Sequence, residues 1–299
     1  MPDGGPSPPP PPRRSRRRRW AFRGALFAAY LLLMTFGSCV DHLVLYPSNE
    51  PVRVPGASRV ALKPEHEKAG EVEVWTLRTP AVAPATEPKA FVLTFIGNAD
   101  RAEYAVQRTV EDWADRPVEV WAVNYPGYGG STGPARLSAI GPAVLSAYDS
   151  LRAVAGTRPI FLSGMSLGTA AALHVSANRP VAGLVLQNPP PLRKMILERY
   201  GWWNLWLIAG PAAMHIPSDL DSIANARRTT APGVFLLAQD DQVVPPRFQQ
   251  AVVAAYAGEK RLIPLPGAAH NDPPAEAQEA ELHAAIDWLW NASVPTSRP

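Results

Sequence analysis

The sequence predicts an α/β fold with a mostly parallel central sheet and helices on both of its faces. Six short runs of β-branched, aromatic and other apolar residues indicate buried strands. One run leads through a tight turn into an alanine-rich helix, as in a βα unit. Polar side chains able to catalyse follow three runs, where the carboxyl ends of parallel strands gather ligands. The predicted strands cover residues 90–96, 118–125, 158–163, 181–188, 233–238 and 261–266.

The chain begins with a head, residues 1–19, that we expect to be disordered. It combines a proline run with six arginines in residues 13–19, a composition that buries too little apolar surface to fold. Without those six charges the formal net charge of +3 becomes negative, so the rest of the chain is not a basic domain. We therefore expect no nucleic-acid partner.

Residues 20–40 are predominantly apolar and predict a membrane anchor or a signal segment. From Gly24 the apolar stretch is roughly 17 residues long, at the short limit of a transmembrane helix and the long limit of a signal core. The arginines before it predict that the head stays inside and the folded domain lies outside. That location would be a bacterial periplasm or a cell surface.

Cys39 ends this stretch and is the only cysteine, so no internal disulfide can form. The segment 36–39 resembles the cleavage box of bacterial lipoproteins, with phenylalanine where leucine is usual. Three outcomes stay open: an uncleaved transmembrane anchor, a lipid attached to Cys39, and a plain cleaved signal. The first two would tether the chain to a membrane.

The folded domain is expected over residues 44–290, with a tail at 291–299. Alternating apolar positions at 57–63 and 71–78 predict an opening pair of strands. A surface helix is predicted over 274–290, because it starts with proline and repeats apolar residues at helical spacing.

Two parallel strands end in glycine-containing loops. Gly97 and Asn98 follow the first strand, either as an ordinary turn or as a source of backbone donors for a negatively charged oxygen. A glycine-rich loop at 126–133 follows the second strand. This loop has neither the Lys-Ser/Thr pair of a P-loop nor a helix-opening G-x-G-x-x-G, so nucleotide binding is not expected.

The turn at 164–168 is the strongest functional signal in the sequence. Ser166 lies between Gly164 and Gly168, and the turn joins a predicted strand to a helix predicted over 169–178. A serine held in strained geometry at such a turn exposes its hydroxyl above the sheet, and the glycines avoid clashes with nearby backbone. The context favours a nucleophile over an ordinary loop serine.

A serine nucleophile needs a histidine base and an acid that orients the histidine. Asp240 and Asp241 directly follow the strand at 233–238, and His270 follows the strand at 261–266. Both positions lie at the carboxyl ends of parallel strands. The two aspartates are alternative acids.

An insertion is expected between the strands at 181–188 and 233–238, since the roughly 45 residues between them exceed an ordinary crossover. We predict a small helical lid at about 190–230. Its aromatic run at 200–208 would pack against the domain body, line an acyl pocket or touch a bilayer.

Together these motifs resemble the α/β-hydrolase superfamily over residues 44–290. The nearest branch is the small-lidded one of acyl-protein thioesterases, monoglyceride lipases and serine aminopeptidases. The resemblance implies a triad of Ser166, Asp241 and His270, with Asp240 as the alternative acid.

The resemblance also implies an oxyanion hole formed by the backbone N–H groups of Leu167 and Asn98. Here the sequence departs from the family, because Ile96 replaces the histidine of a His-Gly-Asn-Ala loop. The replacement removes a supporting side chain, so it weakens the expected position of the loop more than the expected chemistry.

The sequence thus predicts a membrane-tethered serine hydrolase that cleaves carboxylic esters or thioesters of an apolar acyl group through an acyl-enzyme. It shows no close-spaced His, Cys and carboxylate ligand set, so we expect neither metal nor organic cofactor. The expected partners are an acylated small molecule and the membrane, and the chain is expected to be a monomer. Two alternatives stay open: a serine peptidase of the aminopeptidase type, and a catalytically silent, ligand-binding protein.

Overall fold

The structure, a computed structural model, describes residues 13–36, 39–50, 52–63, 70–204 and 206–294. Among these residues one sheet contains the strands β1 (Ser58–Leu62), β2 (Val72–Arg78), β3 (Ala90–Phe95), β4 (Val118–Val123), β5 (Ile160–Met165), β6 (Gly183–Gln187), β7 (Gly233–Ala238) and β8 (Lys260–Leu265). Their spatial order is β1-β2-β4-β3-β5-β6-β7-β8. β2 is antiparallel to both of its neighbours, β1 and β4, and the other pairs are parallel. The predicted fold class is confirmed.

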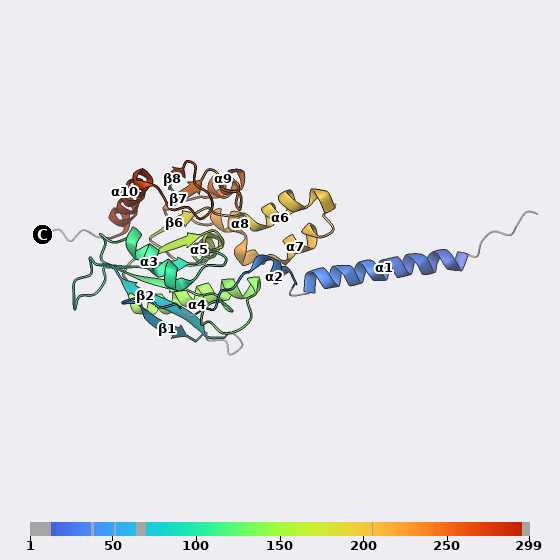
Figure 1. The fold of residues 1–299 in the computed structure, drawn as a ribbon, viewed down its shortest axis with the longest axis horizontal. Coiled ribbons are helices and arrows are strands. Elements are labelled where there is room, and N and C mark those ends of the chain that lie inside the picture. The colour runs from blue at the N-terminus through green and yellow to red at the C-terminus, as the bar shows by residue number, and fades with distance from the viewer. Residues whose placement is uncertain (1–12, 37–38, 51, 64–69, 205, 295–299) are drawn as a thin grey trace, which may run out of the picture.

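Helices cover both faces of this sheet (Figure 1). The covering helices are α3 (Ala102–Asp112), α4 (Leu137–Ala155), α5 (Leu167–Asn178), α8 (Ser222–Ala226), α9 (Pro246–Ala255) and α10 (Glu276–Ser293). Neighbouring contacts join α4 to α5, α5 to α8 and α8 to α9, while α3 and α10 pack separately on the strands. Because both faces are covered, a central strand such as β3 is buried along its whole length, which explains its continuous apolar sequence.

The insertion between β6 and β7 forms helices near the predicted lid boundaries. It contains α6 (Leu192–Tyr200), the 3-10 turns η1 (Trp202–Asn204) and η2 (Ser218–Leu220), α7 (Ala209–His215) and then α8. α6 and α7 pack against each other and lie to one side of the sheet (Figure 1).

The N-terminal part forms a long helix, α1 (Arg13–Phe36), and a short one, α2 (Cys39–Val44). Residues 13–19 are therefore helical where the sequence predicts disorder, in line with the good helix propensity of arginine. The remaining head and tail residues, 1–12 and 295–299, lie outside the described residues. No helix in the described part of the chain is both long and apolar enough to cross a membrane. The expected transmembrane anchor is thus not confirmed, and lipid attachment at Cys39 stays a prediction.

α2 connects the N-terminal part to the domain through Asp41. This buried carboxylate accepts a hydrogen bond from the backbone N–H of Leu137 at the start of α4, at 3.0 Å. The same oxygen lies 3.3 Å from Nε2 of His215 in α7. Asp41 therefore contacts both α4 and α7 of the lid through one carboxylate oxygen.

Candidate active site

The turn between β5 and α5 has the geometry that its glycine spacing predicts. Ser166 has φ 50° and ψ −119°, a backbone conformation that residues other than glycine rarely adopt. A Cβ atom on Gly164 would lie 2.5 Å from the carbonyl oxygen of Gly168, and one on Gly168 would lie 2.1 Å from that of Phe95. Only glycine fits at both positions, because the chain passes close to itself and to β3.

Backbone hydrogen bonds hold Ser166 in this strained conformation. Its N–H donates to the carbonyl of Gln187 at 2.9 Å, so the turn is tied to the end of β6. Its own carbonyl accepts from the N–H of Thr169 at 2.9 Å and from the Thr169 hydroxyl at 2.7 Å. A strained residue persists when its surroundings determine its conformation in this way.

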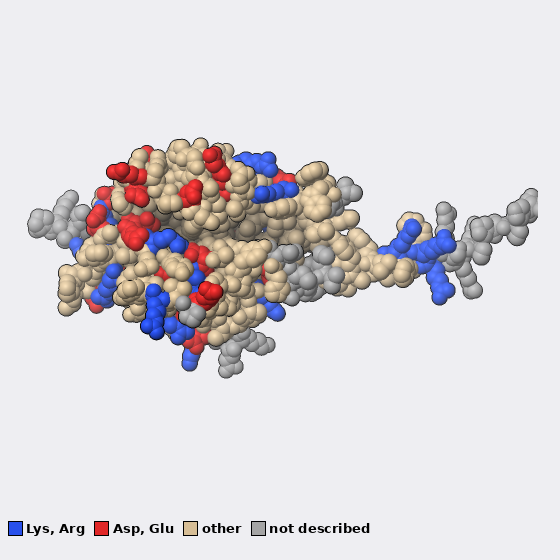
Figure 2. Space-filling model, viewed as in Figure 1, with Lys and Arg blue, Asp and Glu red and all other residues tan. Residues whose placement is uncertain are grey.

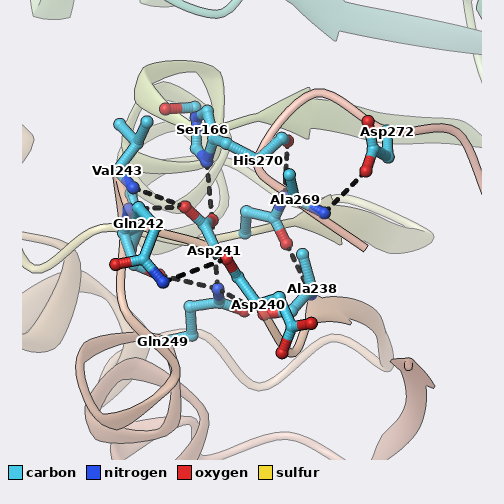
Figure 3. Close-up of polar contacts among 12 residues, drawn as sticks. Ser166, Ala238, Asp240, Asp241, Gln242, Val243, Gln249, Ala269, His270 and Asp272 are labelled. Atoms are coloured by element: carbon cyan, nitrogen blue, oxygen red, sulfur yellow. Dashed lines mark hydrogen bonds and ion pairs between the residues drawn. The ribbon is translucent and has the colours of Figure 1, made fainter. Parts of the chain in front are cut away.

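Asp241, and not Asp240, contacts the histidine. Its Oδ2 lies 2.6 Å from Nδ1 of His270, and Figure 3 shows the imidazole between Asp241 and Ser166. The Asp241 side chain is fully buried, whereas Asp240 is exposed. A hydrogen bond at Nδ1 directs the other ring nitrogen of His270, Nε2, toward proton exchange with a nucleophile.

The carboxylate of Asp241 is held from both sides. Oδ1 accepts from the backbone N–H groups of Val243 and Val244, each at 2.8 Å. The side-chain amide of Gln249 donates to Oδ2 at 3.2 Å and to the Val244 carbonyl at 2.7 Å (Figure 3). These hydrogen bonds fix the orientation of the carboxylate toward His270. Gln249 lies on α9 and was not identified from the sequence.

Asn188 positions the loop that carries the histidine. It is fully buried just after β6, and its amide group donates to the carbonyl of His270 at 2.9 Å. Its side-chain oxygen accepts from the N–H of Ala238, at the end of β7, also at 2.9 Å. One side chain thus joins β6, β7 and the histidine loop, and the sequence carried no signal for this role.

Ser166 and His270 line one cavity of about 870 Å³. Among the residues that the structure describes, no hydrogen bond joins the Ser166 hydroxyl to the imidazole of His270. Catalytic hydrogen bonds are often long or misaligned without substrate, so this geometry does not count against a triad. Leu167 and Asn98 also line this cavity.

The two expected oxyanion donors lie on neighbouring segments of this wall. Leu167 begins α5, where the first N–H groups of a helix have no partner within it. Within the described residues, no acceptor hydrogen-bonds to the backbone N–H of Leu167 or Asn98. Unpaired N–H groups on residues that line the cavity are what an oxyanion hole requires.

The Asn98 side chain replaces the support expected from a family histidine. Its Oδ1 accepts from the N–H of Tyr46 and from the hydroxyl of Tyr128, each at 2.9 Å. Its amide donates to the carbonyl of Val44. Ile96, at the family's histidine position, is instead buried in the core, and its carbonyl accepts from the Tyr125 hydroxyl at 2.9 Å. The end of α2 and the segment after it thus hold the loop that contains Asn98, and sequence reasoning missed these contacts.

One end of the cavity, between α3 and α10, is acidic. Burial, with the charge of Glu111 beside it, raises the pKa of Asp112 to about 7, although Arg108 opposes the shift. Glu279 on α10 adds to it. Among the described residues, no group of three or more His, Cys, Asp or Glu side chains is arranged to hold a metal ion.

Sequence comparisons find distant relatives. No protein family model matches the chain. An uncharacterized protein of Mycobacterium tuberculosis is 31% identical over 159 residues, which are 52% of this chain and 54% of that protein. An alpha/beta hydrolase domain-containing protein of Caenorhabditis elegans is 28% identical over 170 residues, 56% of this chain and 46% of that protein. The chain spans about half the length of the curated relatives it matches.

Structural comparison identifies the fold. An esterase from Pyrococcus furiosus superposes with a TM-score of 0.63 at 13% sequence identity, over 84% of this chain and 98% of that chain. Identity this low shows the fold alone. The chain has the α/β-hydrolase fold, so the fold that its motifs implied is confirmed.

Proposed function

We propose that the protein is a serine hydrolase that cleaves carboxylic esters or thioesters through an acyl-enzyme. The observation that carries the proposal is the 2.6 Å contact between Asp241 and His270, at the cavity that Ser166 also lines. The strained turn of Ser166 supports its assignment as nucleophile. The similarity to an esterase supports esters as the substrate class.

In the proposed mechanism the Ser166 hydroxyl attacks the acyl carbonyl while Nε2 of His270 takes its proton. Asp241 holds the histidine tautomer and stabilises the imidazolium that forms. The N–H groups of Leu167 and Asn98 bind the oxyanion. His270 then gives the proton to the departing alcohol or thiol, and a water activated by the same imidazole releases the acid.

The cavity wall supports an apolar acyl group. Its lining includes Leu192 and Met195 from α6, Leu236 from β7 and the nearby Val243. Apolar walls with a few placed polar groups are typical of small-molecule sites. We further propose that the segment before the domain tethers the enzyme to a membrane; the exposed arginine and aromatic side chains of α1 support this.

The test is hydrolysis of p-nitrophenyl esters from acetate to palmitate by the wild type and by Ser166→Ala, His270→Ala and Asp241→Asn. We expect each change to lower kcat by about a thousandfold or more, with KM little altered. Asp240→Asn is the matched control, and it should stay within about twofold of the wild type because this exposed carboxylate does not contact the imidazole.

Two results would contradict the proposal. The first is Ser166→Ala enzyme that keeps its activity, and the second is equal loss in the two aspartate variants. A wild type that is inert on every ester, yet labelled at Ser166 by a fluorophosphonate, would redirect the search to peptides. A folded wild type that is not labelled would favour a ligand-binding protein.

A further inference from the structure

The lid exposes an apolar surface, which we call the lid aromatic surface. It consists of Trp202, Trp203, Trp206, Leu207, Ile208 and Met214. Trp202 is 70% exposed and Trp203 is 61% exposed, although side chains of this size are normally buried in large part. A contiguous apolar patch at a protein surface commonly marks a contact with a partner or a membrane.

The lid aromatic surface is separate from the cavity. The lid contributes Leu192 and Met195 of α6 to the described cavity lining, which includes none of the three tryptophans. Their exposure also shows that these rings do not pack into the body of the domain. The sequence suggested three uses for the aromatic run: packing against the domain body, lining an acyl pocket and contact with a bilayer. Of these, only contact with a bilayer agrees with both observations.

Helix α1 continues this surface. It packs against α7, and the hydroxyl of Tyr30 donates to the carbonyl of Leu207. α1 itself exposes Trp20, Phe22 and Phe27. The guanidinium of Arg23 lies 5.9 Å from the ring centre of Trp20. Arginine beside tryptophan is the combination found where proteins meet the headgroup layer of a bilayer.

The charge on this end of the molecule is positive. Exposed arginines at 17–19 lie on α1, and α6 adds Arg193, Lys194 and Arg199, against Glu198 on the same helix and Asp221, which lies 3.8 Å from Arg193. On the face seen in Figure 2, acidic side chains gather over α3 and α10, at the end away from α1. The aromatic end would therefore be attracted to an anionic lipid surface, and the opposite end repelled.

We propose that the lid aromatic surface and α1 form one docking surface for an anionic lipid bilayer. The tryptophan rings enter the headgroup layer, and the arginine and lysine side chains contact lipid phosphates. Docking brings the lid to the membrane. Helix α6, which contributes Leu192 and Met195 to the cavity lining, then lies between the cavity and the bilayer. The proposal depends on surface geometry and charge and does not rest on the catalytic assignment.

The test measures sedimentation of the full chain with vesicles. One set contains phosphatidylcholine alone, and the other an equimolar mixture of phosphatidylcholine and phosphatidylglycerol. We expect Trp202→Ser/Trp203→Ser to bind the anionic vesicles about tenfold more weakly than wild type, because two large apolar side chains leave the contact. The matched control, Val154→Ser/Leu262→Ser, removes exposed apolar groups from the body and should stay within about twofold.

Unchanged binding of the tryptophan variant, equal loss in the control, or equal wild-type binding to both vesicle types would overturn the proposal. So would a wild-type dimer that the tryptophan variant converts to a monomer while vesicle binding is absent. Hydrolysis of p-nitrophenyl acetate and the unfolding midpoint are measured in parallel. Both should match the wild type in the tryptophan variant, so failure of docking and failure of catalysis are distinguishable.

Discussion

Asn98 shows how one residue combines two tasks at the site. Asn98 lines the cavity, and its side chain hydrogen-bonds to Val44, Tyr46 and Tyr128. Asn98→Ala keeps the N–H and removes these bonds, so the oxyanion loop is free to shift. We expect kcat on p-nitrophenyl acetate to fall about tenfold with KM unchanged, less than the loss from deleting an oxyanion donor.

Asn178→Ala is the matched control for this change. It also deletes an amide that donates to a backbone carbonyl, that of His174, but at the end of α5 remote from the cavity. Its kcat should equal that of the wild type. A full-rate Asn98→Ala enzyme, or equal losses in the two variants, would show that the Asn98 side chain does not position the loop.

At the scale of elements, the turn between β5 and α5 depends on close approach of two backbones. Gly168→Ala would put a Cβ atom 2.1 Å from the carbonyl oxygen of Phe95, so α5 must move away from β3. We expect a loss of about 3 kcal/mol in the free energy of unfolding, measured with urea, together with loss of esterase activity.

Gly210→Ala in α7 tests whether the effect comes from the site rather than from the added methyl group. The nearest atom to its new Cβ would be 4.0 Å away. Alanine is the better helix former, so the free energy of unfolding should stay the same or rise by up to about 1 kcal/mol. A Gly168→Ala protein as stable as Gly210→Ala would refute the packing argument.

Local patterns predicted the elements that place the site. Continuous apolar runs predicted the central strands because both faces of the sheet are covered. The spacing of Gly164, Ser166 and Gly168 predicted the turn because one of its close approaches, between Gly164 and the carbonyl oxygen of Gly168, lies within the same short segment. The choice between Asp240 and Asp241 as the acid stayed open, because it depends on how the chain turns after β7. In the structure the N–H groups of residues 243 and 244 bind the carboxylate of Asp241 and orient it toward His270.

Contacts between distant segments could not be predicted. Val44 and Tyr46 lie about fifty residues before Asn98, and such pairings leave no local periodicity in a sequence. Ile96 therefore suggested a weakened loop, while the structure supplies another support for it. The catalytic roles of Ser166 and its partners remain predictions until the variants are assayed.

For the whole molecule, the buried Glu73 and the half-buried Asp112 give opposite pH dependences of stability. Burial disfavours the ionised form of Glu73, but hydrogen bonds from Gly130, Arg59 and Asn124 outweigh it and lower the pKa. The contribution of Glu73 to the free energy of unfolding is present above its ordinary pKa of 4.5. It is lost as the pH falls through the lower pKa that Glu73 has in the folded protein. Asp112 behaves in the reverse sense, because its folded pKa is raised from 3.8 to about 7.

Asp112→Asn should therefore stabilise the protein increasingly as the pH rises from about 4 to about 7, and by a constant amount above that. Below pH 3.8 the Asp112 carboxyl is protonated in both the folded and the unfolded protein. As the pH rises toward 7 it ionises first in the unfolded chain, which lowers the free energy of the unfolded state relative to the folded state. Urea unfolding, followed by tryptophan fluorescence, should show the variant close to wild type near pH 4 and more stable by up to about 4 kcal/mol near pH 8. The exposed Asp115, changed to Asn, should show no such divergence. A difference between Asp112→Asn and wild type that is the same at both pH values would mean that packing, and not ionisation, sets the effect.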